Sequence, residues 1–440
     1  MENQPKSRFE GNLLEWSIVR SARSWRIYVV EPDQYRPEHH GKVFRAALTA
    51  LIAPKLSLVD PFKEHLTVGN VKHFDLVTFP EAFLPVDELL SALPMLSQLE
   101  SLGCVHVGLR PTNGAADRHL IHVSEILQLV DSLGRLSEIA RNDLAQFSRW
   151  LESQGDERLF NIGCLFTIDS ERRLRICLHP KLIRSKFEAS PIHEEHMAEA
   201  NLLTLITLLP TDKELFSVTI QPLLCSDALQ LDTDQPHTRP LDGVNTDAHC
   251  LGKNPPDHID IVSIPTCSPQ TESAGDRNRR WHPEFTDSFK RAASDDSLVR
   301  HHYAIFVLAN FRVLRDSLPG GLSGIFMPLP VGSKYPNFVS ISYYGRPKGA
   351  ARALNHWSLP GEQISPGEEM STFGHVTSLD PSTSRGPAQA YMLGFTVSRL
   401  PRDTTRWRQP QGLADFQLQV AHYGSNSAEL IFGQTGRQND

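Results

Sequence analysis

Short apolar runs of strand length alternate with stretches of helical spacing along most of the chain. Strands are predicted at Trp25–Val30, Asp75–Phe79 and Cys104–Gly108, because each run is short, apolar and rich in β-branched residues. Between them, Lys42–Ala53 has apolar residues at helical spacing, and Pro94–Gly103 is expected to form a second, short helix with Asp87 as an N-cap residue before it. A strand–helix–strand order of this kind is typical of an α/β protein.

The later segments continue this pattern with an added pair of helices and a hairpin. The remaining expectations are a loop at Glu31–Gly41, two helices within His122–Gly155, a hairpin of Phe160–Ile168 and Leu174–Leu178, a helix at Glu194–Leu209, a loop at Asp232–Asp257, a strand at Ile259–Ile264, a helix at His282–Val299, and strands at Tyr303–Leu308, Gly320–Phe326, Phe338–Tyr344, Ala390–Ser398 and Phe416–His422. From about Gly345 to Gln389 the composition shifts to Gly, Pro, Ser and Thr. We therefore predict one domain over 1–345, with a helical insertion at about 115–157, and an extension over 346–440 for oligomerisation or partner binding.

Composition and charge exclude several classes of protein. The 440 residues are 40% hydrophobic and 22% charged, which is a globular composition, and the formal net charge of -7 argues against a general nucleic-acid binder. We expect no membrane association, because the longest apolar runs are about half of what a bilayer requires, and no secretory signal, because the first twenty residues are polar. The six cysteines form no CxxC pair, so neither a metal site nor a disulfide framework is indicated, and we expect a cytoplasmic protein.

The stretch Phe216–Leu229 is the first candidate for chemistry. An apolar run ends at Cys225, and the small polar residues Ser226 and Asp227 follow. A strand that stops at a cysteine can present a thiol as a nucleophile. The alternative is a core cysteine, since cysteine is among the most buried residue types.

Two further strand ends carry reactive side chains, Glu81 after Asp75–Phe79 and Lys181 after the predicted hairpin. Ligands gather at the carboxyl ends of strands in α/β folds. A carboxylate, an ammonium and a thiol suit attack on a carbon bonded to nitrogen, with the carboxylate as general base, the thiolate as nucleophile and the ammonium facing the oxyanion. Each also has a simpler explanation: Glu81 as a helix cap and Lys181 as an exposed loop lysine.

These segments, in this order, resemble the nitrilase (carbon–nitrogen hydrolase) superfamily over roughly residues 26–344. The matching residues are Asp75–Glu81, Val107-Gly108, Phe160-Asn161-Ile162 with Phe166–Asp169, Lys181, Cys225-Ser226-Asp227, Ile259–Pro265 and Val307–Asn310. Ser226 stands where the family usually has an aromatic residue, and Leu-Ile-Arg follows the lysine.

The resemblance implies a nitrilase-like α-β-β-α sandwich and a catalytic triad of Glu81, Lys181 and Cys225, with no metal and no organic cofactor. It implies a second glutamate that positions the lysine or the substrate; Glu188 matches best by position, with Glu194 and Glu195 as competitors. The main-chain N–H of Ser226 would join Lys181 at the oxyanion. It further implies a homodimer or higher homo-oligomer acting on a small-molecule amide, carbamoyl compound or nitrile through a thioacyl-enzyme. The alternative is a catalytically degenerate module that binds a ligand or serves a multi-protein assembly, such as a bacterial defence system.

Overall fold

The computed structural model describes the parts of the chain that carry most of the predicted elements. These are residues 9–20, 25–32, 34–52, 74–112, 119–185, 197–229, 239–246, 248–252, 255–269, 281–311, 313–314, 320 and 323–328, and, further on, the strands between 338 and 435.

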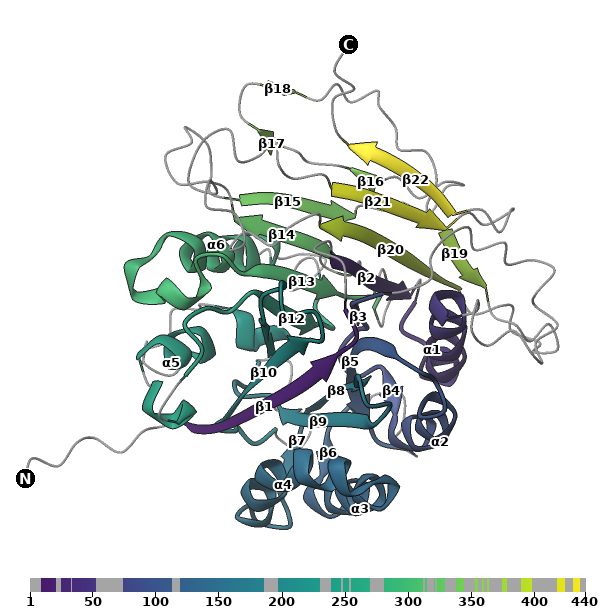
Figure 1. Cartoon of the computed structure of the whole chain (residues 1–440), viewed down its shortest axis with the longest axis vertical. Coiled ribbons are helices and arrows are strands. Elements are labelled where there is room, and N and C mark those ends of the chain that lie inside the picture. The colour runs from purple at the N-terminus through teal and green to yellow at the C-terminus, as the bar shows by residue number, and fades with distance from the viewer. Residues whose placement is uncertain are drawn as a thin grey trace, which may run out of the picture.

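Two large sheets dominate this mixed α/β fold (Figure 1). The eight-stranded sheet has the order β1 (Glu10–Ile18), β10 (Leu202–Pro210), β11 (Val218–Pro222), β12 (Ile261–Pro265), β13 (Ile305–Ala309), β14 (Gly324–Pro328), β15 (Phe338–Tyr343) and β16 (Ala353–Leu354). The ten-stranded sheet has the order β22 (Leu430–Thr435), β21 (Leu418–Tyr423), β20 (Gln389–Val397), β2 (Trp25–Pro32), β3 (Leu76–Thr78), β5 (Leu102–Arg110), β8 (Ile162–Ile168) and β9 (Leu174–Pro180), with β4 (Leu84–Pro85) beside β5 and β19 (Gly374–Thr377) beside β20. Two further pairs are β6 (Ile121–His122) with β7 (Leu159–Phe160) and β17 (Ser358–Leu359) with β18 (Glu362–Gln363).

The helices fall into two groups (Figure 1). They are α1 (Pro37–Ile52), α2 (Val86–Leu96), α3 (Val123–Leu136) and α4 (Glu138–Glu152) in the first group, and α5 (Pro240–Thr246) and α6 (Trp281–Ser294) in the second. Short 3-10 helices cover Cys225–Ala228, Ala248–Leu251 and Asp296–His301.

Three buried apolar clusters hold these elements together. One joins the ten-stranded sheet to α1–α4, for example Val77 with Leu48 and Leu93. A second draws on both sheets, with Leu76 from one and Ile261 from the other. The third joins the eight-stranded sheet to α5 and α6. Each central strand therefore buries both faces, which explains its nearly continuous apolar sequence.

The predicted helix at Glu194–Leu209 is wrong. Its second half forms β10, which pairs in parallel with β1 and antiparallel with β11. Almost the whole of LLTLITLLP is apolar, and such a run cannot be assigned to a strand or a helix from periodicity alone. The partner β1 was not predicted, because its alternating pattern lies in a stretch that reads as polar.

Three other expectations were also wrong. The loop at Glu31–Gly41 is shorter than predicted, because α1 begins at Pro37, and a proline is well suited to the first helical position. Pro94 lies inside α2, and Asp87 lies in the first turn of that helix after Pro85 at the N-cap. The expected loop at Asp232–Asp257 contains α5 and a 3-10 helix among its described residues. The two inserted helices and the hairpin are confirmed as α3, α4, β8 and β9.

Strands from the predicted extension continue both sheets. β16 pairs with β15, and β20 pairs antiparallel with β2 along its length, from Trp25 opposite Val397 to Pro32 opposite Ala390. In the described part of the chain, no helix combines the length and the apolar character needed to cross a membrane.

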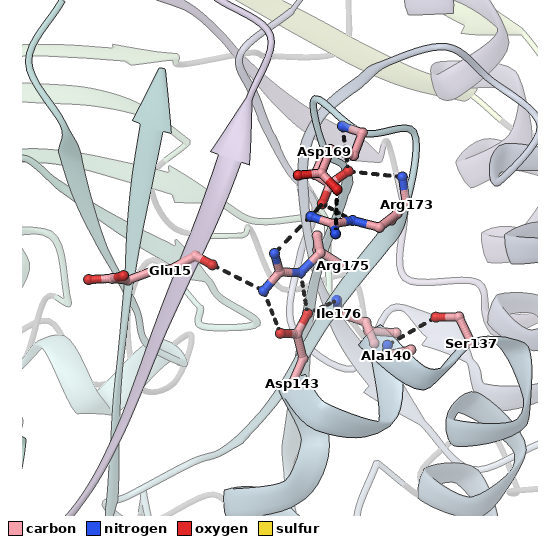
Figure 2. A network of polar contacts seen from close by, with 9 residues as sticks. Glu15, Ser137, Ala140, Asp143, Asp169, Arg173, Arg175 and Ile176 are labelled. Atoms are coloured by element: carbon pink, nitrogen blue, oxygen red, sulfur yellow. Dashed lines mark hydrogen bonds and ion pairs between the residues drawn. The ribbon is translucent and has the colours of Figure 1, made fainter. Parts of the chain in front are cut away.

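A buried network of charges ties the inserted helix α4 to the β8–β9 hairpin (Figure 2). Asp143 of α4 accepts two hydrogen bonds from Arg175 of β9, at 2.8 and 2.7 Å, and one from the main-chain N–H of Ile176. The Arg175 guanidinium also donates to the main-chain carbonyl of Glu15 in β1. Asp169, in the hairpin turn, lies 3.7 Å from Arg175. This network joins three elements that are distant in sequence.

Breaking this network should destabilise the fold. In Asp143→Ala, Arg175 keeps its charge in a largely buried position but loses its bidentate partner, so we expect a loss of about 3 kcal/mol in the free energy of unfolding. The matched control is Asp131→Ala in α3, whose ion pair with Arg135 is exposed, and which should cost about 0.5 kcal/mol or less. Urea unfolding of both variants measures the two losses, and equal losses would contradict the role of the network.

Candidate active site

Glu81 lies in a tight turn directly after β3. The main-chain N–H of Glu81 donates to the carbonyl of Thr266, which follows β12 in the other sheet. The next residue, Ala82, has a φ of 50°, in the left-handed region that favours glycine. A side chain at Gly108 in β5 would not fit, because its Cβ would lie 2.5 Å from the Cα of Glu81. Glycine at position 108 therefore allows this turn to lie against the sheet.

The carboxylate of Glu81 is buried and bound to three donors. Lys181 Nζ lies 2.7 Å from Glu81 Oε1, and the side-chain amide of Asn161 donates to the same oxygen at 2.8 Å. The main-chain N–H of Cys267 donates to Oε2 at 3.1 Å. Glu81 is therefore not a helix cap, and its bonds join the ends of β3, β8, β9 and β12.

Lys181 follows the last residue of β9 and is 1% exposed. It is therefore not a surface lysine. Its main-chain N–H donates to the carbonyl of Asn161, which extends the β8–β9 ladder by one more bond. The ladder thus directs the lysine and the asparagine amide toward the same carboxylate.

Cys225 begins a 3-10 helix three residues beyond the end of β11. Its φ is 41°, which for a residue with a side chain costs on the order of 1–3 kcal/mol. Strained strand-to-helix turns of this kind present the nucleophile in α/β-hydrolases. The side chain is 5% exposed.

Asp227 joins the turn that carries Cys225 to the segment that carries Lys181. Its Oδ1 accepts the main-chain N–H groups of Leu182 and Ile183, at 2.9 and 2.8 Å, and Oδ2 accepts that of Leu224. Burial raises the pKa of Asp227 to about 7, and the positive charge of Lys181 opposes this rise. Ser226 adds a bond from its hydroxyl to the carbonyl of Ile183. The turn and the lysine segment therefore form one hydrogen-bonded unit.

Three of the other cysteines are poor nucleophiles in the folded protein. Burial raises the pKa of Cys104 to about 12 and also raises the pKa values of Cys164 and Cys177 well above the usual value of a thiol. The thiolate is the reactive form of cysteine. These three thiols are therefore expected to be unreactive while the protein stays folded.

The structure brings Glu81 and Lys181 into contact and bonds the Cys225–Ser226 turn to the residues after Lys181. Glu188 and its competitors Glu194 and Glu195 lie outside the described residues.

Sequence reasoning missed the main-chain N–H of Cys267 as a partner of Glu81, since no sequence signal marks a backbone donor. It noted Asn161 and Asp227 only as parts of motifs. Asp227 follows Cys225 by two residues, which was the available signal for it, whereas Asn161 comes beside Lys181 only through the β8–β9 pairing. No group of three or more potential metal ligands occurs within the part of the chain that the structure describes.

Comparisons with known proteins return only distant similarity. No protein-family model and no curated protein sequence matches this chain. Among solved structures, an N-terminal amidase aligns with 62% of this chain at 8% identity and a TM-score of 0.30, and the chain spans 54% of its length. An N-terminal amidase with an Asn-Glu-Ala peptide and one with a cysteine-to-serine substitution each align with 69% of this chain and 90% of their own, at 9% and 8% identity and a TM-score of 0.34. Similarity this low does not establish a shared family.

Proposed function

We propose that this protein hydrolyses a non-peptide carbon–nitrogen bond of an amide, carbamoyl compound or nitrile through a thioacyl intermediate on Cys225. The observation that carries the proposal is the buried Glu81–Lys181 ion pair, because Asp227 bonds the residues that follow Lys181 to the strained turn of Cys225. A buried ion pair rarely contributes net stability, because desolvation offsets its attraction. A chemical role explains why this ion pair lies at the ends of β3 and β9.

In the proposed reaction on an amide, Glu81 takes the proton of the Cys225 thiol, and the thiolate attacks the carbonyl carbon. Lys181 and the main-chain N–H of Ser226 receive the negative oxygen of the tetrahedral intermediate. The carbon–nitrogen bond then breaks, and Glu81 gives its proton to the departing amine. A thioester remains on Cys225.

A water molecule then hydrolyses the thioester on Cys225. Glu81, again ionised, takes a proton from a water molecule that attacks the thioester carbon. The second tetrahedral intermediate collapses, the carbon–sulfur bond breaks and the proton returns to the thiol. The carboxylic acid leaves, and Cys225 and Glu81 return to their first states. Asn161 and the main-chain N–H of Cys267 keep the Glu81 carboxylate oriented while it accepts and releases the proton.

We also propose an architecture for this protein. We assign the two sheets and two helical groups to an α-β-β-α sandwich, because one apolar cluster draws on both sheets and the other two join each sheet to its own helices. A high-resolution crystal structure tests this assignment, and sheets that do not face each other would overturn it.

The direct test of the site is thiol labelling. Native protein is treated with iodoacetamide at neutral pH, and the labelled cysteines are identified by mass spectrometry. A thiol beside a general base should make Cys225 react far ahead of the other five cysteines, including the half-buried Cys250. Uniform slow labelling would favour the degenerate binding module. In Glu81→Gln the preference for Cys225 should disappear, because the base is lost.

A further inference from the structure

A row of four buried polar side chains lies between the two sheets, next to the candidate site. Nε2 of His106 and Nε2 of His179 lie 2.8 Å apart. Nδ1 of His106 lies 2.8 Å from the hydroxyl of Ser263, and that hydroxyl lies 2.8 Å from the hydroxyl of Thr78. The row is one continuous chain of hydrogen bonds across an otherwise apolar core.

The strands place each member of this row close to a residue of the candidate site. Thr78 is the last residue of β3, three positions before Glu81. His179 is two positions before Lys181, so both lie on one face of the chain as it leaves β9. Ser263 lies opposite Pro222 of β11, and its carbonyl accepts the N–H of Leu223, two positions before Cys225.

The ladder brings the remaining member, His106, to the centre of the row. His106 lies opposite Thr78 in the β3–β5 pair, and β8 separates β5 from β9. A Cβ at Gly163 of β8 would lie 2.2 Å from Nε2 of His179. Glycine at this position therefore leaves the space in which the two imidazoles meet across β8.

The hydrogen bond between the two rings requires at least one neutral imidazole. Between the two facing Nε2 atoms, one ring must donate and the other must accept, so the pair cannot carry a proton on every nitrogen. Burial lowers the pKa of His179 to about 3 and lowers the pKa of His106 well below its usual value, with His179 as an additional cause for His106. The thiols of Cys104 and Cys177 are the titratable groups of the apolar cluster between the sheets. The charged side chains nearest to the row in sequence are those of Glu81 and Lys181, which are paired with each other.

We propose that the chain of Thr78, Ser263, His106 and His179 positions the proposed catalytic groups. It would hold β3 and β9, which lead to Glu81 and Lys181, at a fixed distance from β12. β12 lies next to β11, which leads to Cys225. Apolar packing alone permits small sliding of two sheets, whereas directional hydrogen bonds fix their relative position. The inference rests on the proposed function, and these four residues are positioning residues that touch no reacting atom.

The first experiment measures the labelling rate of Cys225 by iodoacetamide in the full chain. Ser263→Ala removes the shared hydroxyl with little change of volume, and His106→Leu removes the central ring. We expect each variant to label Cys225 about ten- to a hundredfold more slowly than the native protein, because displacements of the order of 1 Å have effects of this size. His106→Gln keeps a donor that can reach His179 and should recover part of the rate.

The matched control is His301→Leu. His301 is also buried, hydrogen-bonded by its Nε2 to Gln221, and has a pKa lowered to about 3 by burial. It belongs to the 3-10 helix after α6 rather than to the row between the sheets. The labelling rate of Cys225 should therefore be unchanged in His301→Leu.

Acid unfolding tests whether the two imidazoles are neutral in the folded protein. Below pH 6.5 the unfolded chain protonates both histidines while the folded protein keeps them neutral, so the native protein loses stability as the pH falls from 6.5 towards 4. The double variant His106→Leu/His179→Leu lacks this loss. For each unit by which the pH falls, the unfolding equilibrium constant of the native protein should therefore increase by a factor about a hundred times larger than that of the double variant. Slower labelling of Cys225 in variants that stay folded at neutral pH, with the rate partly recovered in His106→Gln, indicates positioning, whereas equal slowing in His301→Leu indicates general damage to the core.

The outcomes distinguish the two proposals. Preferential labelling of Cys225 in the native protein, with unchanged rates in Ser263→Ala and His106→Leu, overturns the positioning role alone. Absence of preferential labelling in the native protein overturns the proposed function. Slower labelling in His301→Leu to the same degree as in His106→Leu also overturns the positioning role, because the effect would not be specific to the row.

Discussion

Replacing Cys225 by alanine is expected to abolish the release of ammonia from primary amides and nitriles by this protein. The thiol is the atom that forms the proposed thioester, and removal of a nucleophile from a catalytic unit lowers turnover by about a thousandfold or more. Lys181→Met and Glu81→Gln should each have a comparable effect, because the three groups act in the same steps.

A more specific prediction concerns the variant that combines all three substitutions. If the three residues act as a unit, the triple variant Glu81→Gln/Lys181→Met/Cys225→Ala should be no slower than Cys225→Ala alone. Additive losses would instead indicate three independent contributions. The measurement is ammonia release across a panel of primary amides and nitriles, and Cys250→Ala is the control that keeps activity. Full turnover in Cys225→Ala would refute the mechanism.

Lys181→Met should be the most destabilising of the substitutions at the site. Lys181 and Glu81 are 1% and 5% exposed at their side chains, and their charged atoms lie 2.7 Å apart. The methionine fills a similar volume but leaves the Glu81 carboxylate buried with only the Asn161 amide and the Cys267 N–H as partners. Removing one member of a buried pair costs about 3–5 kcal/mol. Urea unfolding at neutral pH measures this loss.

A second substitution in the same background tests the cause. Glu81→Gln added to Lys181→Met removes the uncompensated charge and should restore part of the lost stability rather than add to the loss. A double variant less stable than Lys181→Met would show that packing, and not the buried charge, is responsible. Arg135→Met, in the exposed pair with Asp131, should change stability by about 0.5 kcal/mol or less.

Local sequence patterns predicted most of the strands, the two inserted helices and the β8–β9 hairpin. They did so where apolar spacing and turn residues agree, as in the hairpin turn around Asp169. They failed at β10, because a run of leucines buried on both faces has no period that separates a strand from a helix. They failed at β1 as well, because its identity as a strand depends on pairing with β10, about 190 residues away in sequence, as in Glu10 opposite Leu202.

The sequence by itself determined the candidate residues Glu81, Lys181 and Cys225, since each follows an apolar strand and residue chemistry limits the possible roles. Tertiary structure alone decided which groups surround them. The backbone N–H of Cys267, the carboxylate of Asp227 and the His106–His179 pair lie at or beside the site only because the strand ends of two sheets meet there. Hydrogen bonds act over about 3 Å, and no local pattern in a chain reports which distant residues folding will bring that close.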